Sequence, residues 1–256
     1  MENDKELAVA TKFAPVPWRP GAESVVDACR ASNERLGVEA CDLYQIHFPD
    51  LIQPFKPFGF EKRKDELYWE GLASCYEQGL AKNVGVSNYG PTMIRRVHEV
   101  FAKKSIPIVS NQINFSLVRF KSSMETVQVC NELGIKVLAY FPLGNGILAG
   151  KYNLDDPSSM PKFPKSITMK KYLEGAAPLL TEVRAIAAER GKSCAQVSIN
   201  WIIQKGVIPI PGCRNAAHAK DNFGAMDFDL TAEEVQRLDA ASLSSREFSS
   251  GGFDLV

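Results

Sequence analysis

The feature that most constrains the fold is a repeated alternation between short apolar runs and longer segments with helical periodicity. Apolar runs of strand length occur at residues 7–12, 41–46, 81–86, 107–112, 135–140 and 207–210. Between them, apolar residues recur every three or four positions, as in residues 21–36 and 65–78, which is typical of helices that cover a sheet. Strands that are almost continuously apolar are buried on both faces, so the pattern indicates an α/β fold with a parallel sheet.

Turn-forming residues mark the ends of several predicted helices. Gly79 and Gly134 stand at two C-terminal ends, where a helix often takes a left-handed residue. Pro91 begins another helix, because its missing N–H costs nothing in the first turn. Thr231 and Glu234 have the spacing of a capping box and predict the start of the last helix.

The connection after the fifth predicted strand is unusually long. Residues 141–170 contain glycine and proline without clear helical periodicity, and long connections inside a compact domain are usually functional or disordered. Helices are expected at 172–190, 194–204 and 216–223. The tail after Ser244 is rich in serine and glycine, and we expect it to be loosely held.

The bulk composition is that of one globular domain without an obvious polyanionic partner. The chain has 256 residues, a formal net charge of zero and 45% hydrophobic residues, so neither nucleic acid nor an anionic membrane surface is indicated. No apolar run reaches the roughly 18 residues of a membrane span, and the first residues lack the apolar stretch of a signal peptide. The six cysteines form no Cys-x-x-Cys pair, so we expect free thiols and no metal site.

Polar or aromatic residues stand at the carboxyl ends of five of the six predicted strands. They are Lys12, His47, Ser87 with Asn88, Gln112 and Tyr140. In a barrel of parallel strands these ends meet at one face, so we predict a site there. Taken singly, each has an ordinary alternative: a solvated lysine, a hydrogen-bonded structural histidine, a loop amide or a core aromatic ring.

These strand ends lie in motifs that resemble the aldo-keto reductases, most closely their plant plastid-type branch. The matching stretches are Ala10-Thr11-Lys12-Phe13, Asp42-Leu43-Tyr44-Gln45-Ile46-His47, Val84-Gly85-Val86-Ser87-Asn88-Tyr89, Asn111-Gln112-Ile113-Asn114, Ala139-Tyr140-Phe141-Pro142-Leu143-Gly144 and Ile208-Pro209-Ile210-Pro211-Gly212. They follow the family's order and cover essentially the whole chain. The resemblance implies a (β/α)8 TIM barrel forming a single domain over residues 1–256, with about six of the eight βα units present.

The resemblance also implies hydride transfer from NADP(H) to an aldehyde or ketone, a small carbonyl substrate. It gives Lys12 and His47 catalytic roles, because negative charge develops on the carbonyl oxygen and donors must already face it. It places Ser87, Asn88 and Gln112 on the nicotinamide carboxamide, and Tyr140 under the nicotinamide ring.

The rest of the cofactor is implied to lie on two later segments. A strap over the pyrophosphate is expected from Phe141, Leu143, Gly144, Gly146 and Lys151, although Phe141 departs from the serine that is usual in the family. The adenosine phosphate is expected on Gly212, Arg214, His218 and Asn222. Arg214 and His218 favour NADPH over NADH by offering positive groups to a 2′-phosphate, although His218 replaces the arginine or glutamine that is often found there.

The family's aspartate and its proton-donating tyrosine belong before the lysine strand and are not found in this sequence. Tyr44 faces away from His47 by strand alternation, Tyr89 follows the carboxamide pair, and Tyr140 is assigned to the ring. We therefore expect an amino-terminally truncated barrel with two open sheet edges, and a chain of doubtful activity. Met1 is then an internal methionine of a longer protein.

Three readings stay open. The first is an NADP(H)-dependent carbonyl reductase, and the second is a non-catalytic NADP(H)-binding protein or regulatory subunit. A weaker third is a phosphate-binding lyase or isomerase, which lacks the expected carboxylates or metal ligands. Neither nucleic acid nor membrane insertion is expected, the oligomeric state is open, and the location is plastid by the resemblance or otherwise cytoplasmic. Aromatic and proline residues at 54–60 predict an apolar wall for the substrate.

Overall fold

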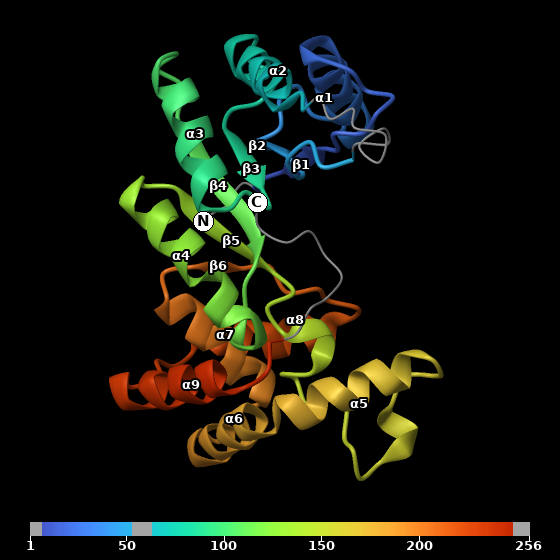
Figure 1. Cartoon of the computed structure of the whole chain (residues 1–256), viewed down its shortest axis with the longest axis vertical. Helices are drawn as coiled ribbons and strands as arrows, with labels where there is room; N and C mark the ends of the chain where they lie inside the picture. Colours follow the sequence, from blue (N-terminus) through green and yellow to red (C-terminus); the bar gives the residue numbers. More distant parts are fainter. Residues whose placement is uncertain (1–6, 53–62, 248–256) are drawn as a thin grey trace, which may run out of the picture. The chain divides into compact units, whose positions relative to one another are not determined.

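The computed structural model describes residues 7–52 and 63–247, in which short strands alternate with helices along the chain (Figure 1). The strands are β1 (Ala10–Phe13), β2 (Leu43–Ile46), β3 (Val84–Ser87), β4 (Ile108–Asn114), β5 (Lys136–Tyr140) and β6 (Ile208–Pro209). The helices are α1 (Ala22–Leu36), α2 (Asp65–Glu77), α3 (Pro91–Ala102), α4 (Phe120–Glu132), α5 (Lys165–Gly175), α6 (Ala177–Arg190), α7 (Cys194–Gln204), α8 (Ala216–Phe223) and α9 (Ala232–Ser244). Short 3-10 turns are η2 (Leu117–Arg119), η3 (Gly144–Gly146), η4 (Pro157–Ser159) and η5 (Gly224–Met226).

The sheet is parallel and follows chain order, β1-β2-β3-β4-β5-β6. In β1 and β2, Lys12 lies in register with Gln45, and Phe13 lies in register with Ile46. Within the described residues β1 pairs with β2, and β6 pairs with β5. The predicted α/β fold is confirmed, although the first strand begins at Ala10 and the last is only two residues long.

The chain divides into two compact units. The first comprises residues 1–112, 128–136 and 253–256, and the second comprises residues 113–127 and 137–252. One domain over residues 1–256 therefore stays a prediction.

In the first unit, α1 packs closely on α2. A Cβ on Gly71 would lie 2.4 Å from the carbonyl oxygen of Ala22 and 2.7 Å from Cβ of Val25. Only glycine allows this approach, and it lets Val25, Trp69 and Leu72 become completely buried. The packing therefore explains why α2 contains a glycine that helix propensity disfavours.

In the second unit the core is centred on Trp201 of α7. Its ring is stacked on Phe115 at 5.4 Å between centroids and meets the edge of Phe120 at 5.0 Å. Its indole N–H donates to Asp239 at 2.8 Å, so the polar atom of a buried tryptophan is satisfied. The capping box predicted at Thr231 and Glu234 is present at the start of α9.

Two predictions about the second unit were wrong. The helix expected at 172–190 is two helices, α5 and α6, which meet at Ala176 (φ −99°, ψ 4°). The break precedes Pro178 in the first turn of α6, because proline lacks an N–H and restricts the residue before it. The long connection accordingly ends at Pro164.

The start of the tail is also held in place. The N–H of Arg246 donates to Gly175 O at 2.9 Å, and Glu247 Oε1 accepts the N–H of Ser122 at 2.8 Å. The expectation of a loose tail was therefore wrong for residues 245–247, and residues 248–256 lie outside the described part, as does the apolar wall predicted at 54–60.

All six cysteines carry free thiols. In the described ranges, no helix combines the length and apolar character that a membrane crossing requires. The same ranges contain no cluster of three or more histidine, cysteine, aspartate or glutamate side chains arranged to hold a metal ion.

Candidate functional site

Lys12 and His47 come together at the carboxyl ends of β1 and β2. The backbone N–H of His47 donates to Phe13 O at 2.8 Å, so the two strand ends are joined directly. Burial lowers the pKa of His47, and the positive charge of Lys12 lowers it further. That electrostatic effect requires proximity, and a shared catalytic role for the two side chains stays a prediction.

The ammonium group of Lys12 is partly buried and carries no ion pair or hydrogen bond within the described residues. Burial lowers its pKa, because removing water disfavours the charged form. Desolvated groups of this kind concentrate at functional sites. A solvated surface lysine, the ordinary alternative, does not describe this position.

The next two strand ends form a hydrogen-bonded amide cluster. The Ser87 hydroxyl donates to Gln112 O at 2.7 Å, and the Asn88 backbone N–H donates to the same oxygen at 2.9 Å. Asn88 Nδ2 donates to His47 O at 2.9 Å and to Ser87 Oγ at 3.1 Å. Asn88 has a φ of 61°, a left-handed conformation that asparagine tolerates better than most residues. The ends of β2, β3 and β4 are thereby fixed to one another.

The side chain of Gln112 differs from the others in this cluster. It is only 7% exposed, yet its amide group makes no hydrogen bond to any described residue. Its amide oxygen and nitrogen are not among the fully buried atoms that lack a partner, and an amide offers both donors and acceptors. Gln112 is therefore available to a ligand that presents the complementary groups.

Gln45 is a buried polar residue for which the sequence predicted no role. Its Nε2 donates to Val86 O and to Ser110 Oγ, both at 3.1 Å, and it is 1% exposed. Gly85 makes room, because a Cβ there would lie 2.3 Å from Ser110 Oγ. Strand alternation, which places Gln45 on the same face as His47, is the signal that could have identified it.

The tyrosines near these strand ends turn away from His47. The Tyr44 hydroxyl is buried without a partner among the described residues, and burial together with nearby thiols raises its pKa. Tyr89 is completely buried and accepts a hydrogen bond from Trp69 Nε1 at 2.9 Å. The prediction that Tyr44 faces the helices agrees with this geometry.

In the second unit, Tyr140 ends β5 and meets Phe141 edge to face, with 5.2 Å between ring centroids. Phe141 is 44% exposed and has a φ of 51°. The loop then turns on itself: the N–H of Gly144 donates to Phe141 O, and that of Gly146 donates to Leu143 O, both at 2.9 Å. The amides of both predicted strap glycines are thus already used.

Packing also requires the first of these glycines. A Cβ on Gly144 would lie 2.8 Å from Val118 Cγ2, and Gly144 has a φ of 53°. A Cβ on Gly146 would meet the aliphatic chain of Lys151 at 3.1 Å. Lys151 itself is exposed, with its Nζ 5.0 Å from the ring centroid of Tyr152. An internal structural role for both glycines therefore stands beside the phosphate role.

The predicted adenosine-phosphate residues lie at and around α8. Arg214 lies just before the N-cap of α8, and His218 and Asn222, four residues apart, follow one face of the helix. Asn215 caps α8 by accepting the N–H of His218 at 2.9 Å. Gly212, Arg214 and His218 are exposed, and nothing lies within 4 Å of a Cβ built on Gly212. This surface leaves space for a ligand.

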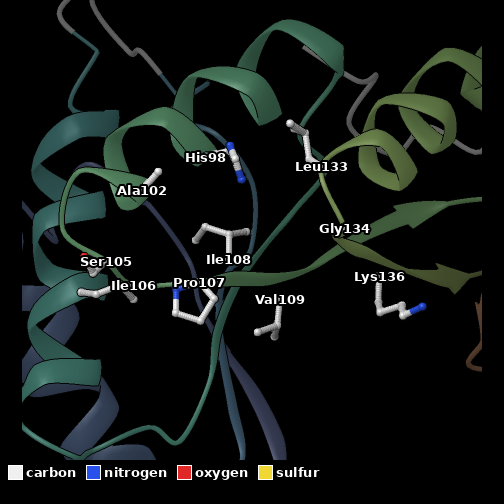
Figure 2. A pocket seen from close by; sticks show the side chains of 10 residues that line it. All are labelled: His98, Ala102, Ser105, Ile106, Pro107, Ile108, Val109, Leu133, Gly134 and Lys136. Atoms are coloured by element: carbon white, nitrogen blue, oxygen red, sulfur yellow. The ribbon is translucent and has the colours of Figure 1, made fainter.

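A hollow in the described part of the chain lies elsewhere. It has a volume of about 460 Å³ and is lined by residues at the end of α3, the start of β4 and the turn before β5, including His98, Ile108 and Lys136 (Figure 2). Gln112 lies toward the opposite end of β4. None of the predicted site residues lines this hollow, so its apolar floor carries no part of the candidate site.

Comparison with known proteins gives a consistent result. The model of the Aldo/keto reductase family matches residues 1–243. Pyridoxal reductase from the chloroplast of Arabidopsis thaliana is 39% identical over 241 residues, which is 94% of this chain and 63% of that protein. An uncharacterised oxidoreductase of Mycobacterium tuberculosis is 31% identical over 249 residues, which is 97% of this chain and 72% of that protein.

The solved structures agree. The Bombyx mori aldo-keto reductase, crystallised in complex with NADP, has a TM-score of 0.69 and 28% identity, covering 94% of this chain and 69% of that one. As the coverage of 63% shows, this chain spans somewhat under two thirds of the length of the Arabidopsis relative. With a family match over nearly its whole length and relatives of the same kind, the chain belongs to the aldo/keto reductase family.

Proposed function

We propose that this chain carries the NADP(H) site and two catalytic groups of a carbonyl reductase that converts an aldehyde or ketone to an alcohol. The observation that carries the proposal is the partly buried ammonium of Lys12, which has no partner among the described residues, beside the imidazole of His47. Such an arrangement is costly to folding and has an evident use where negative charge develops on an oxygen.

The residues present fit the nicotinamide group. Gln112 is a buried amide without a hydrogen-bond partner among the described residues, and Ser87 and Asn88 lie beside its backbone carbonyl. A carboxamide would complete the donors and acceptors that this cluster leaves open. The Bombyx mori relative was crystallised with NADP, which supports the same cofactor here. When bound, the reduced cofactor supplies the hydride.

The chain's own groups then act on the substrate oxygen. Because the pKa of His47 is lowered, its imidazole is neutral at pH 7 and donates one N–H to the carbonyl oxygen. The positive charge of Lys12 stabilises the negative charge that grows on that oxygen, and water supplies the proton that completes the alcohol. The Arabidopsis relative is named a pyridoxal reductase, so an aldehyde on an aromatic ring is the first substrate class to test. Its chloroplastic description supports a plastid location.

Arg214, just before α8, and His218, in its first turn, carry the preference for NADPH. Both are exposed and lie four residues apart, with Asn222 one turn further on for the adenine. A 2′-phosphate placed over this face would gain a charge-assisted hydrogen bond from the guanidinium group. In the remaining proposed roles, Tyr140 stacks on the nicotinamide ring, and Phe141, Leu143, Gly144, Gly146, Lys151 and Gly212 line the phosphates.

Titration of the purified chain with NADPH, followed by cofactor fluorescence, tests the proposal. Gln112→Ala should weaken binding about tenfold, because a buried amide contact is worth roughly 1–1.5 kcal/mol. The control Gln128→Ala removes an exposed glutamine that bonds only Glu132 on α4 and should leave binding unchanged. Equal affinities for the two variants, or no binding by the folded chain, would refute the cofactor site.

A second candidate is an NADP(H)-binding protein without turnover, in a regulatory role. The observation that favours it is the burial of the Tyr44 and Tyr89 hydroxyls away from His47, which leaves neither phenol at the substrate oxygen. Binding of NADPH at normal strength, with no consumption over a panel of aromatic aldehydes and ketones, would select this candidate.

A further inference from the structure

Two buried carboxylates that the proposed reaction does not use lie just after β2 and at the start of α2. Asp50 and Asp65 are each only 4% exposed. Buried aspartates are uncommon because removing a carboxylate from water is costly unless it is well hydrogen bonded. The burial of these two carboxylates therefore needs a structural explanation.

The two residues bond each other's chain segment reciprocally. Asp65 Oδ1 accepts the backbone N–H of Asp50 at 2.9 Å, and Asp50 Oδ2 accepts the backbone N–H of Lys64 at 2.8 Å. The remaining oxygen of Asp65 pairs with Arg63 Nε at 2.7 Å. The chain leaving β2 is thus fastened to the start of α2 by two bonds that point in opposite directions.

The fastened segment is the one that carries His47. Phe48, Pro49 and Asp50 are all buried, whereas His47 is exposed. The backbone of His47 is held by Phe13 O and by Asn88 Nδ2, and its ring lies 5.4 Å from the ring of Phe48. We call the two reciprocal hydrogen bonds of Asp50 and Asp65 the clamp. Asp50 lies three residues beyond His47, so the clamp fixes the direction in which the chain leaves β2.

A buried tyrosine links the same clamp to the strand of Lys12. Tyr68, one turn into α2, is 1% exposed, and its ring lies 5.5 Å from that of Phe13. Burial, and then the negative charges of Asp50 and Asp65, raise the pKa of Tyr68 to about 12. The first turn of α2 thus contacts both the clamp and β1.

We propose that Asp50 and Asp65 are positioning residues, whose reciprocal hydrogen bonds hold the imidazole of His47 in its place at the carboxyl end of β2. The imidazole is the group that needs such support, because its own side chain is exposed while its neighbours are packed. The use of His47 rests on the proposed function, but its placement does not, and the two are tested separately.

Histidine NMR of the isotope-labelled chain reads the placement without any turnover. The sequence has three histidines, so His98 and His218 serve as internal references outside the clamp. Asp50→Ala removes the acceptor of the Lys64 N–H and should move the His47 ring signals. It should also raise the His47 pKa by about half a unit toward its ordinary value, as the loosened ring moves away from its packed neighbours and from the positive charge of Lys12.

Two further variants separate hydrogen bonding from charge. Asp50→Asn keeps an oxygen that can accept the Lys64 N–H, so it should restore the wild-type His47 signals and pKa. The control Asp42→Ala removes an aspartate that also accepts a backbone N–H, from Val9 at 2.8 Å, and should leave His47 unchanged. If charge alone acted, Asp50→Asn would equal Asp50→Ala, and both would lower the His47 pKa further.

Asp65→Ala provides an independent arm should Asp50→Ala fail to fold. It should shift His47 in the same direction, and the double variant should move His47 no further than either single change, because the two bonds form one device. Unchanged His47 signals in either folded alanine variant would overturn the proposal. Failure of NADPH to bind the wild-type chain would instead refute the proposed function and leave this result intact.

Discussion

The two units treat their polar groups in opposite ways. In the first, Ser87, Asn88 and Gln112 are buried and tied together at the strand ends. In the second, Arg214 lies just before α8 and His218 lies in it, and both are exposed. Groups that are buried and mutually bonded are already ordered before a ligand arrives, whereas exposed side chains must be ordered by the ligand. The first unit is built for orientation, and the second for attraction of charge.

The contrast extends to the charged residues. The second unit pairs its less exposed charges: Arg190 with Glu234 at 2.5 Å, Lys205 with Asp239 at 2.6 Å and Arg237 with Glu182 at 2.5 Å. The first unit leaves Lys12 unpaired within the described residues. We therefore expect changes at Lys12 to affect turnover most, and changes at the ion pairs of the second unit to affect stability most.

The largest expected effect is on turnover. Lys12→Met removes the positive charge at the proposed site and should reduce the rate of NADPH consumption with an aromatic aldehyde by about 100- to 10,000-fold. The control Lys82→Met removes an exposed lysine that pairs with Asp42 at 2.8 Å and should retain the rate. Similar rates in the two variants would remove the functional half of the comparison.

The second effect concerns the stability of the second unit and its pH dependence. Hydrogen bonds from Arg190 lower the pKa of Glu234 from 4.5 to about 2. A lowered carboxyl pKa contributes stability above pH 4.5 that is lost as the pH falls toward 2. Glu234→Gln keeps the capping geometry, since glutamine also serves there, and should cost about 1–2 kcal/mol at pH 7 by urea unfolding.

The control for that measurement is Glu233→Gln, which changes an exposed neighbour in the same first turn of α9. It should change stability far less. A difference between wild type and Glu234→Gln that persisted undiminished at pH 2 would show that the charge of Glu234 is not what stabilises the unit.

The third effect sharpens the role of the second unit as a charge-attracting surface. Arg214→Ala should weaken NADPH binding about tenfold and leave NADH binding nearly unchanged, because only NADPH offers a 2′-phosphate. Lys220→Ala, which removes an exposed cation on α8, is the matched control. A loss of affinity for both cofactors alike would assign Arg214 a general structural role.

The smallest expected effect is a gain in stability on replacing Lys12, whereas most substitutions destabilise a protein. Lys12→Met should raise the free energy of unfolding by about 0.5–1 kcal/mol at pH 7, because a desolvated ammonium is replaced by an apolar chain. The pKa of Lys12 is lowered in the folded chain, so the destabilisation it causes is present at neutral pH. It disappears as the pH rises toward 10.5. A variant less stable than wild type at pH 7 would show that Lys12 is favourably solvated after all.

The sequence by itself determined the elements and most of their limits. Gly79, Gly134 and Gly191 adopt the left-handed conformation at helix ends, Pro91 opens α3, and the Thr231 capping box opens α9. These signals act within one or two turns of chain, where local sterics and backbone hydrogen bonds decide the outcome. The family's motifs likewise pointed to the strand ends that carry Lys12 and His47.

Only the tertiary structure decided which of those residues are buried, paired or already engaged. The unpaired state of Lys12, the link from Asn88 to His47 and the clamp between Asp50 and Asp65 all depend on residues from different strands and helices. The used amides of Gly144 and Gly146 depend on how one loop folds back on itself. Burial and pairing depend on contacts between residues that are distant in sequence. Periodicity along the chain does not indicate which of those residues come into contact.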